Sequence, residues 1–280
     1  MADVVVAPAP AKLNLFLHVT GRRADGYHLL ETLFRFIDCA DTLRLRLRED
    51  AVVVRTDPLP GVAPEQDLCM RAARLLQAEA GVARGVEIGL DKRIPMGGGL
   101  GGGSSDAATV LVALNRLWQL GWPRQRLQAL ALRLGADVPV FVFGRSAFGS
   151  GIGEHLQPVE LPAAWYLVLV PAAPVSTASV FADAELTRNS DPIKIRRFSA
   201  GPGRNDLEPV VCRRHPEVAR HLAWLRQHGP AGVTGSGGCV FAAFSSQAQA
   251  QRIHRALPPD MHGFVARGID RHPLVDWSTD

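Results

Sequence analysis

The chain has 280 residues, is 47% hydrophobic and 21% charged, and carries a formal net charge of +4 at pH 7, so it can bury one large core or two modest ones. No stretch reaches the ~18 to 20 apolar residues that span a bilayer, and the amino terminus does not read as a secretory signal, so we expect a cytoplasmic protein without a membrane span. The mild positive charge is compatible with an anionic ligand without indicating one, and Cys39, Cys69, Cys212 and Cys239 form no Cys-x-x-Cys pair that would indicate disulfides or zinc.

Alternation of polar and apolar residues predicts a half-buried strand that begins near Lys12. Lys12 and Asn14 alternate with Leu13 and Leu15, so the two polar side chains share one face of this strand. A turn at residues 25–26 follows, and the same alternation returns over residues 29–37, 43–48 and 52–55. These runs predict an antiparallel meander.

Helix signals begin at Asp67, which can cap a helix that Gly81 ends, and residues 86–90 return as a strand. An apolar helical stripe covers residues 110–118, and Pro123 opens a second helix that stops at Gly135. Gly, Ser and Pro then cluster over residues 144–162. We place a domain boundary there and expect domains at residues 1–155 and 156–280.

The second part predicts a small sheet backed by helices, which gives the whole chain an α+β fold. We expect strands at 165–170, 240–244 and 264–269, and helices at about 177–186, 207–211, 216–227 and 247–256. Residues 187–204 are polar, and we expect this segment to be mobile.

Six glycines lie within residues 97–103, directly before the helical stripe. Glycines let an anion approach the backbone, and a helix amino terminus offers unpaired N–H groups, so this pattern predicts a phosphate-binding loop. The alternative is a tight turn with Ser104 or Ser105 as a helix cap. That alternative explains one or two glycines better than six, because each costs about 0.5–1 kcal/mol relative to alanine.

Two common phosphate-binding motifs do not fit this loop. A Walker A motif needs a lysine after its last glycine, where this chain has Ser104. A dinucleotide fingerprint needs an acidic residue about 20 positions further on, whereas the next carboxylate after Asp106 is Asp137. Asp106 itself would repel a triphosphate unless it points away or meets a metal ion.

Four motifs in this order resemble those of the GHMP small-molecule kinases: Pro-Ala-Lys-Leu-Asn at 10–14, the loop at 95–106, Gly-Ala-Asp-Val-Pro at 135–139, and Gly-Val-Thr-Gly-Ser-Gly-Gly at 232–238. The likeness runs from about residue 8 to about residue 275 and is strongest to the branch that acts on 4-diphosphocytidyl-2-C-methylerythritol in the non-mevalonate isoprenoid pathway. It implies an ATP-binding amino-terminal domain like ribosomal protein S5 domain 2, a ferredoxin-like carboxyl-terminal domain that completes the substrate site, and a site between them.

The resemblance implies that Asp137 and Lys12 activate the acceptor hydroxyl, with Lys12 also neutralising developing charge. Read without the resemblance, Asp137 could be a helix cap and Lys12 a solvated strand residue. The resemblance also implies ATP as co-substrate, with magnesium carried by ATP and a hydroxyl from Ser104 or Ser105 as a candidate ligand. The ATP contacts that it implies come from Pro95, Met96, Gly97, Gly98, Gly99, Leu100, Gly101, Gly102, Gly103, Ser104 and Ser105. Lys92 is expected near the nucleotide by its position alone.

For the acceptor, the family uses a Gly-Tyr-His element to bind cytidine, which corresponds here to Tyr27 and His28. A second aromatic residue on the far side of the base corresponds to Phe181, for which core packing is an equal alternative. Asn14 is an expected orienting group. The second glycine loop implies contacts from Thr234, Gly235 and Gly237, with a simple turn as the alternative.

Two other functions remain open at this point. The acceptor could be another alcohol, such as homoserine or a mevalonate-type compound, bound by the same superfamily fold. Alternatively, the chain could be an RNA-binding module, although no cluster of aromatic and basic residues supports that reading. We therefore expect a small-molecule partner, with neither nucleic acid nor membrane, and the sequence does not indicate the oligomeric state.

Overall fold

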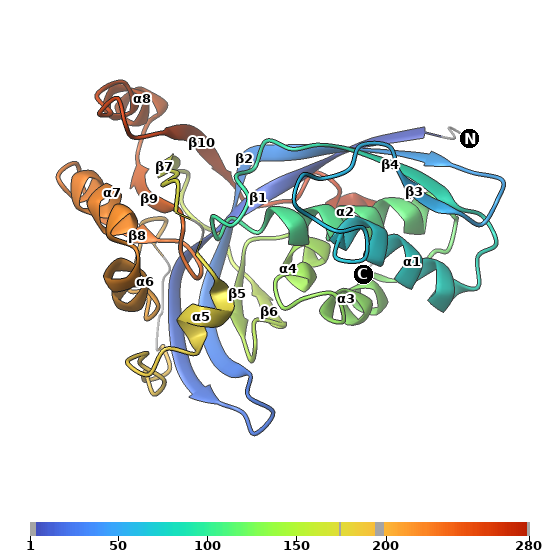
Figure 1. The fold of residues 1–280 in the computed structure, drawn as a ribbon, viewed down its shortest axis with the longest axis horizontal. Coiled ribbons are helices and arrows are strands. Elements are labelled where there is room, and N and C mark those ends of the chain that lie inside the picture. Colours follow the sequence, from blue (N-terminus) through green and yellow to red (C-terminus); the bar gives the residue numbers. More distant parts are fainter. Residues whose placement is uncertain (1–3, 174, 194–198, 279–280) are drawn as a thin grey trace.

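The computed structural model describes residues 4–173, 175–193 and 199–278, and Figure 1 shows their arrangement. Lys194 and its four following neighbours, which belong to the segment predicted to be mobile, lie outside the described residues. No helix in the described ranges combines the length and the apolar character that crossing a bilayer requires.

A long antiparallel hairpin joins the two halves of the molecule (Figure 1). Its strands are β1 (Val4–Arg22) and β2 (His28–Leu47), and the predicted turn between them is present, with Gly26 at a φ of 91°. The predicted runs at 29–37 and 43–48 are one strand, not two. A bulge in β2 after Ile37, where Ala11 pairs with Ile37 and Pro10 with Ala40, breaks the alternation without ending the strand.

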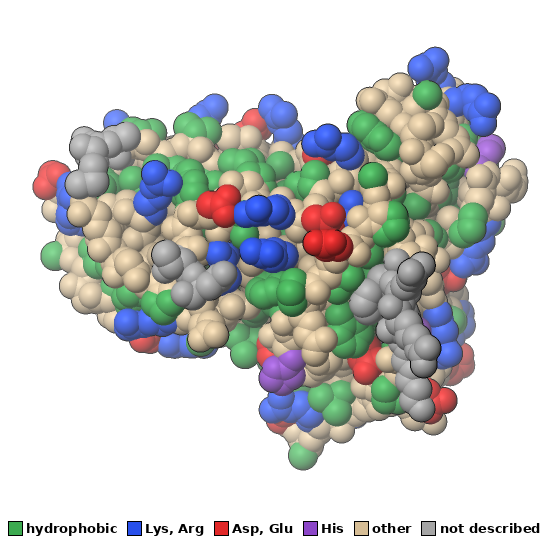
Figure 2. Space-filling view, turned by 180° about the vertical axis from the view of Figure 1, so that it is seen from behind, with side chains coloured by type: hydrophobic (Ala, Val, Ile, Leu, Met, Phe, Trp, Pro, Cys, Tyr) green, Lys and Arg blue, Asp and Glu red, His purple; other side chains and the backbone are tan. Residues whose placement is uncertain are grey.

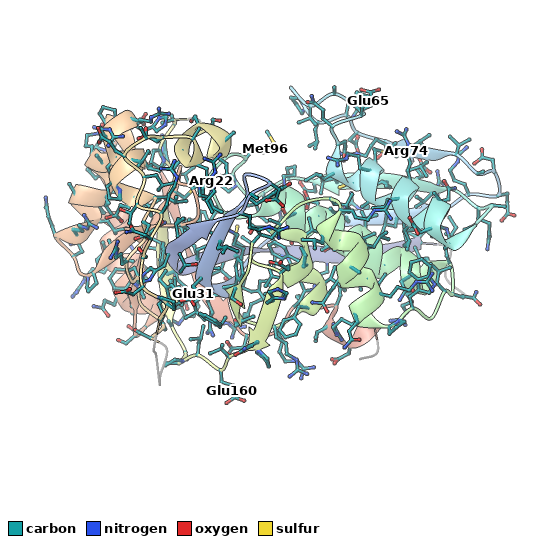
Figure 3. The ribbon with its side chains drawn as sticks, turned by 90° about the horizontal axis from the view of Figure 1, so that it is seen from below. Arg22, Glu31, Glu65, Arg74, Met96 and Glu160 are labelled. Atoms are coloured by element: carbon teal, nitrogen blue, oxygen red, sulfur yellow. The ribbon has the colours of Figure 1, made fainter. Side chains whose placement is uncertain are left out.

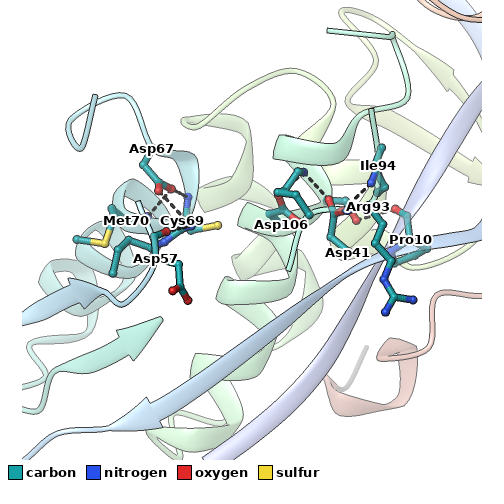
Figure 4. Close-up of polar contacts among 12 residues, drawn as sticks. Pro10, Asp41, Asp57, Asp67, Cys69, Met70, Arg93, Ile94 and Asp106 are labelled. Carbon is teal, nitrogen blue, oxygen red and sulfur yellow. Dashed lines mark hydrogen bonds and ion pairs between the residues drawn. The ribbon is translucent and has the colours of Figure 1, made fainter. Parts of the chain in front are cut away.

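The predicted meander is wrong at its last strand. β4 (Val86–Asp91) pairs antiparallel with β2, but β3 (Val53–Arg55) pairs parallel with β4. Helix α1 (Leu68–Ala80) connects β3 to β4, and such a crossover connection permits parallel pairing. The caps of α1 are as predicted, because Asp67 accepts hydrogen bonds from the amides of Cys69 and Met70 and Gly81 ends the helix (Figure 4).

Three helices complete the first half: α2 (Gly102–Leu117), α3 (Arg124–Leu132) and the unpredicted α4 (Val138–Phe143). Their apolar side chains form one core with α1, β2 and β4. The Gly/Ser/Pro-rich region holds a second unpredicted feature, a hairpin of β5 (Ala147–Ser150) and β6 (His155–Pro158). The proposed domain boundary at 155/156 falls inside β6. The short 3-10 helix η1 (Val275–Trp277), from the end of the chain, packs on the core of the first half. The boundary therefore stays a prediction.

The second half is an antiparallel sheet in the order β10-β7-β9-β8. These strands are β10 (Gly263–Ile269), β7 (Trp165–Leu169), β9 (Val240–Phe244) and the unpredicted β8 (Ala231–Val233). β10 also pairs with β2, which makes a single ten-stranded sheet of the described strands.

Helices α6 (Glu208–Arg214), α7 (Pro216–Arg226) and α8 (Gln247–Arg255) lie where the sequence predicts helices. Helix α5 (Thr177–Phe181) ends five residues earlier than predicted, because Asp183 and Arg188 hold the following residues in turns. The expected α+β fold is confirmed.

Candidate active site

A cavity of about 580 Å³ lies where the glycine loop, the long hairpin and α5 meet. It receives side chains from both halves of the molecule. Its polar and charged lining residues are Lys12, Asn14, Thr32, Gln66, Asp67, Lys92, Ser104, Asp106, Asp137, Thr177 and Ser236. Met96, which Figure 3 labels, belongs to the lining and is 63% exposed at its rim.

The glycine loop lines the cavity from Pro95 to Ser104. Gly97, Gly99 and Gly101 have φ values of 73°, 76° and 73°, a region that side-chain-bearing residues rarely adopt. Helix α2 begins at Gly102. Its N-cap residue is Gly101, and no side chain accepts a capping hydrogen bond from the first amides. The first N–H groups of a helix have no partner inside the helix, so the cavity faces uncapped amides at the positive end of the helix dipole.

The two serines after the loop have different environments. The Ser105 hydroxyl is buried and donates a hydrogen bond to the Pro10 carbonyl oxygen at 2.7 Å. Neither serine caps α2, which begins before both of them. Of the two predicted hydroxyls, Ser104 lines the cavity and Ser105 ties the loop to β1.

Lys92 lies under the loop between two buried carboxylates. Its Nζ donates to Asp41 and, at 2.9 Å, to Asp106, while Asp41 also accepts from the amides of Arg93 and Ile94 (Figure 4). Burial opposes the charge of Lys92, but Asp106 and Asp41 outweigh it, so the pKa of Lys92 is raised. The loop thus rests on an ordered ammonium group.

Asp106 belongs to the cavity lining, and its Oδ2 is paired with the Lys92 ammonium. Its side chain is 3% exposed, and burial raises its pKa to about 7 although Lys92 opposes that shift. Its Oδ1 has no hydrogen-bond partner among the described residues.

Lys12 and Asp137 meet at the cavity wall, 125 positions apart in sequence. Lys12 Nζ lies 3.2 Å from Asp137 Oδ2, and it also donates to Asn14 Oδ1 and to the Gly99 carbonyl oxygen. Lys12 is 1% exposed, so it is not a solvated strand residue. Asp137 precedes α4, but its side chain caps no amide and is 40% exposed.

Asn14 has a fixed orientation. Its Nδ2 donates to Thr32 Oγ1 at 2.8 Å, while the Thr32 hydroxyl donates to the Phe16 carbonyl oxygen at 2.6 Å. Since the amide nitrogen is committed to Thr32, the amide oxygen faces the Lys12 ammonium. Thr32 therefore orients the lysine through Asn14, a role that no sequence motif indicates.

The second glycine loop packs against the first, backbone to backbone. The Cys239 amide donates to the Gly98 carbonyl oxygen at 3.0 Å, and a Cβ on Gly235 would lie 3.2 Å from both Asn14 Oδ1 and the Gly99 carbonyl oxygen. Gly235 lines the cavity. Thr234 and Gly237 do not line it. The Thr234 side chain is fully buried, and its hydroxyl accepts a hydrogen bond from the backbone N–H of Asn14, while Gly237 faces Val211.

The residues expected to bind cytidine lie at the α5 side of the cavity. The rings of His28 and Phe181 have centroids 5.0 Å apart, and Phe181 belongs to the lining. Tyr27 is 58% exposed, and neither Tyr27 nor His28 belongs to the lining. The structure thus brings His28 and Phe181 together and leaves the Tyr27 ring in solvent.

Several lining residues carry no recognisable sequence signal. Ser236 lies 2.6 Å from Thr177, hydroxyl to hydroxyl, across the two loops at the cavity mouth. At the α1 side, an apolar wall comes from a Pro/Gly-rich connection and the first turn of the helix, where the residues are Leu59, Val62, Leu68 and Cys69.

No group of three or more His, Cys, Asp or Glu side chains forms a metal site within residues 4–173, 175–193 and 199–278. On the face in Figure 2, Lys and Arg side chains stand beside Asp and Glu side chains. Such mixing of charge gives no support on this face to the RNA-binding alternative.

Two protein-family models match this chain. Residues 67–145 match the GHMP kinases N terminal domain, and residues 184–262 match the GHMP kinases C terminal domain. The 4-diphosphocytidyl-2-C-methyl-D-erythritol kinase of Thiobacillus denitrificans is 66% identical over 96% of this chain and 97% of its own.

Solved structures agree as well. A crystal structure of 4-(cytidine 5'-diphospho)-2C-methyl-D-erythritol kinase matches with a TM-score of 0.81 and 35% identity, over 94% of this chain and 99% of that one. A mevalonate kinase structure, at 15% identity and a TM-score of 0.67 over 95% of this chain and all of its own, shares the fold alone.

Proposed function

Since the chain belongs to the GHMP kinase family, and within it to the 4-diphosphocytidyl-2-C-methyl-D-erythritol kinases, we propose that it transfers the γ-phosphate of ATP to the 2-hydroxyl of 4-diphosphocytidyl-2-C-methyl-D-erythritol. The fold expected from the family resemblance is confirmed. The observation that carries the proposed site is the Lys12–Asp137 pair, which faces the same cavity as the uncapped start of α2.

The glycine loop is the proposed site for the phosphates of ATP. Uncapped amides at the start of α2 can donate to phosphate oxygens, and the helix dipole favours their charge. The apolar wall beside α1 then suits the adenine ring, which would place ATP over Pro95–Ser104 and beside Lys92.

The described residues fit a magnesium ion that arrives with ATP. They hold no carboxylate cage, and the Ser104 hydroxyl lies at the cavity next to the phosphate site. When bound, the ion would neutralise charge on the phosphates. Asp106 remains paired with Lys92, so Ser104 is the proposed protein contact.

Transfer needs one proton acceptor and one cation beside the reacting hydroxyl. The hydroxyl oxygen forms a bond to the γ-phosphorus, the bond to the β–γ bridging oxygen breaks, and the hydroxyl proton goes to the Asp137 carboxylate. Lys12, fixed by Asn14 and the Gly99 carbonyl, holds Asp137 in place and balances negative charge on the transferring group.

The acceptor is proposed to lie toward α5. Its cytosine would stack near Phe181 and His28, and Tyr27 would close over the other side of the base only when substrate is bound. Gly235 and Ser236 line the cavity beside the reacting groups and are better placed for contact with the substrate than the buried Thr234.

The test compares three acceptor alcohols in parallel incubations. Purified protein, ATP and magnesium are mixed with the diphosphocytidyl alcohol or with mevalonate or homoserine, and phosphomonoester formation is followed by phosphorus NMR. Product from the cytidine-linked alcohol alone supports the proposal. Product from mevalonate or homoserine alone would move the function elsewhere within the superfamily, and RNA binding without any kinase activity would refute it.

A further inference from the structure

Arg188 connects the two residues expected to hold the cytosine. It lies in the connection after α5, within the segment predicted to be mobile, and its guanidinium donates four hydrogen bonds. Three go to carbonyl oxygens, those of Phe181 at 3.0 Å, Asp183 at 2.6 Å and Leu186 at 3.2 Å. The fourth runs from Nε to His28 Nε2 at 3.1 Å.

This fourth bond determines which nitrogen of His28 carries a proton. A guanidinium has only donors, so His28 Nε2 must accept and cannot hold a proton. In a neutral imidazole the proton then lies on Nδ1. Among the described residues, His28 Nδ1 has no hydrogen-bond partner, which leaves it as a donor for a ligand.

We propose that Arg188 is a positioning residue that fixes His28 as an Nδ1–H donor and anchors the Phe181 backbone, so that the site accepts cytosine and rejects uracil. The inference rests on the proposed function, because it assigns the pyrimidine of that substrate to His28 and Phe181. Arg188 itself need not touch the base.

The chemistry of the two bases supplies the discrimination. Cytosine has an unprotonated N3 that can accept a hydrogen bond, whereas uracil carries a proton on N3. A fixed N–H donor therefore pairs with cytosine N3 and meets a second donor in uracil, which leaves both groups unpaired. A histidine free to exchange its tautomers could serve either base.

The surroundings of His28 also favour the neutral form of the ring. Burial, the charge of Arg188 and then the charge of Arg22 lower the pKa of His28. A protonated ring would lose the bond from Arg188, since both ring nitrogens would then be donors.

The test measures base preference without needing turnover. The probes are CDP and UDP, whose dissociation constants are measured by calorimetry for the wild-type protein and for Arg188→Met. We expect the wild type to prefer CDP, and the variant to lose about tenfold of that preference, which is the value of one hydrogen bond. Nitrogen NMR of His28 should show an Nδ1–H ring in the wild type and mixed tautomers in the variant.

Arg213→Ala is the matched control. Arg213 anchors the same connection through Asp183 and Glu185 but does not touch His28. It should keep both the CDP preference and the tautomer. Arg188→Lys, which keeps the cation, should retain part of the preference and serves if the methionine variant does not fold.

The inference would be overturned by an unchanged CDP preference in Arg188→Met, by an equal loss in Arg213→Ala, or by an Nε2–H ring in the wild type. Equal binding of CDP and UDP by the wild type would overturn it too. Failure of the proposed function has a different signature, since the protein would then form no phosphomonoester whatever its preference between CDP and UDP.

Discussion

Lys12 Nζ lies 3.2 Å from the Asp137 carboxylate, and the two side chains differ sharply in exposure. Lys12 is almost fully buried, while Asp137 is 40% exposed to the cavity. The lysine is thus part of the fold as well as of the site, whereas the aspartate supports the fold only through its contact with that lysine. Substitutions at the two positions should separate these roles.

Asp137→Asn should reduce kcat by about 10² to 10⁴-fold, the usual contribution of a positioned proton acceptor. Asp137 caps no amide, but it is the carboxylate partner of the buried Lys12, so the loss of its charge should cost about 1–3 kcal/mol and lower the melting temperature by several degrees. Initial rates and thermal unfolding check both points. Wild-type turnover in this variant would remove Asp137 from the mechanism.

Lys12→Met should lose both activity and stability. The change leaves the Gly99 carbonyl and Asn14 Oδ1 without their donor in a buried region, which costs about 1–3 kcal/mol. We expect turnover to fall by about 10²-fold or more. Urea unfolding and initial rates measure the two effects.

The pairing of the two residues predicts that their effects on kcat are not additive. If Lys12 acts partly by holding Asp137, the double variant should lose less activity than the product of the two single losses. Fully multiplicative losses would show that the two groups act independently.

Asp106 predicts a pH-dependent stability difference. Its pKa is raised to about 7 by burial, so between about pH 4 and 7 the folded state holds a proton that the unfolded state releases. This group therefore stabilises the fold at low pH, and its contribution is lost as the pH rises toward 7. The side chain in Asp106→Asn does not titrate. As the pH rises from 5 to 7, the stability of this variant relative to the wild type should therefore increase by about 1–2 kcal/mol.

Urea unfolding of both proteins at several pH values measures that difference. Subtracting the two curves removes the titration of all other groups. Asp41→Asn is a useful comparison, since it removes a second carboxylate from Lys92. A difference between wild type and Asp106→Asn that stays constant with pH would mean that Asp106 remains ionised throughout.

Local signals predicted the parts of the fold that depend on neighbours in sequence. Asp67 caps α1 and Gly81 ends it because both effects need only a few adjacent amides. Contacts between segments far apart in sequence could not be predicted from such local signals. Alternation at Lys12 predicts one solvated strand face, but the glycine loop and α2 cover that face, so the lysine is buried.

The same distinction holds for the candidate site. The glycine loop is visible in sequence because six glycines are costly without a ligand. The contact of Gly98 with Cys239 and the role of Thr32 depend on segments that meet only in the folded chain. Arg188 was missed because its segment is polar and lacks periodicity, although its side chain holds His28.

Gly97 and Gly99 give a matched pair for testing the close packing of the two glycine loops. Both have φ near +75°, so alanine at either position costs about 1–2 kcal/mol of backbone strain. A Cβ on Gly97 meets nothing within 4 Å, whereas one on Gly99 would collide with the Thr234 carbonyl oxygen.

Gly97→Ala should therefore lose stability and, because Gly97 lies in the proposed ATP site, some ATP affinity, with kcat at saturating ATP little changed. Gly99→Ala should also displace the carbonyl that holds Lys12, because the chain must move away from Thr234, and its kcat should fall by about 10-fold or more beyond any loss in Gly97→Ala. Initial rates at saturating ATP, compared with urea unfolding of both variants, make the measurement. Equal rates at equal stability would show that the Gly99 carbonyl does not position Lys12, and the lysine would then depend on Asn14 alone for its orientation toward Asp137.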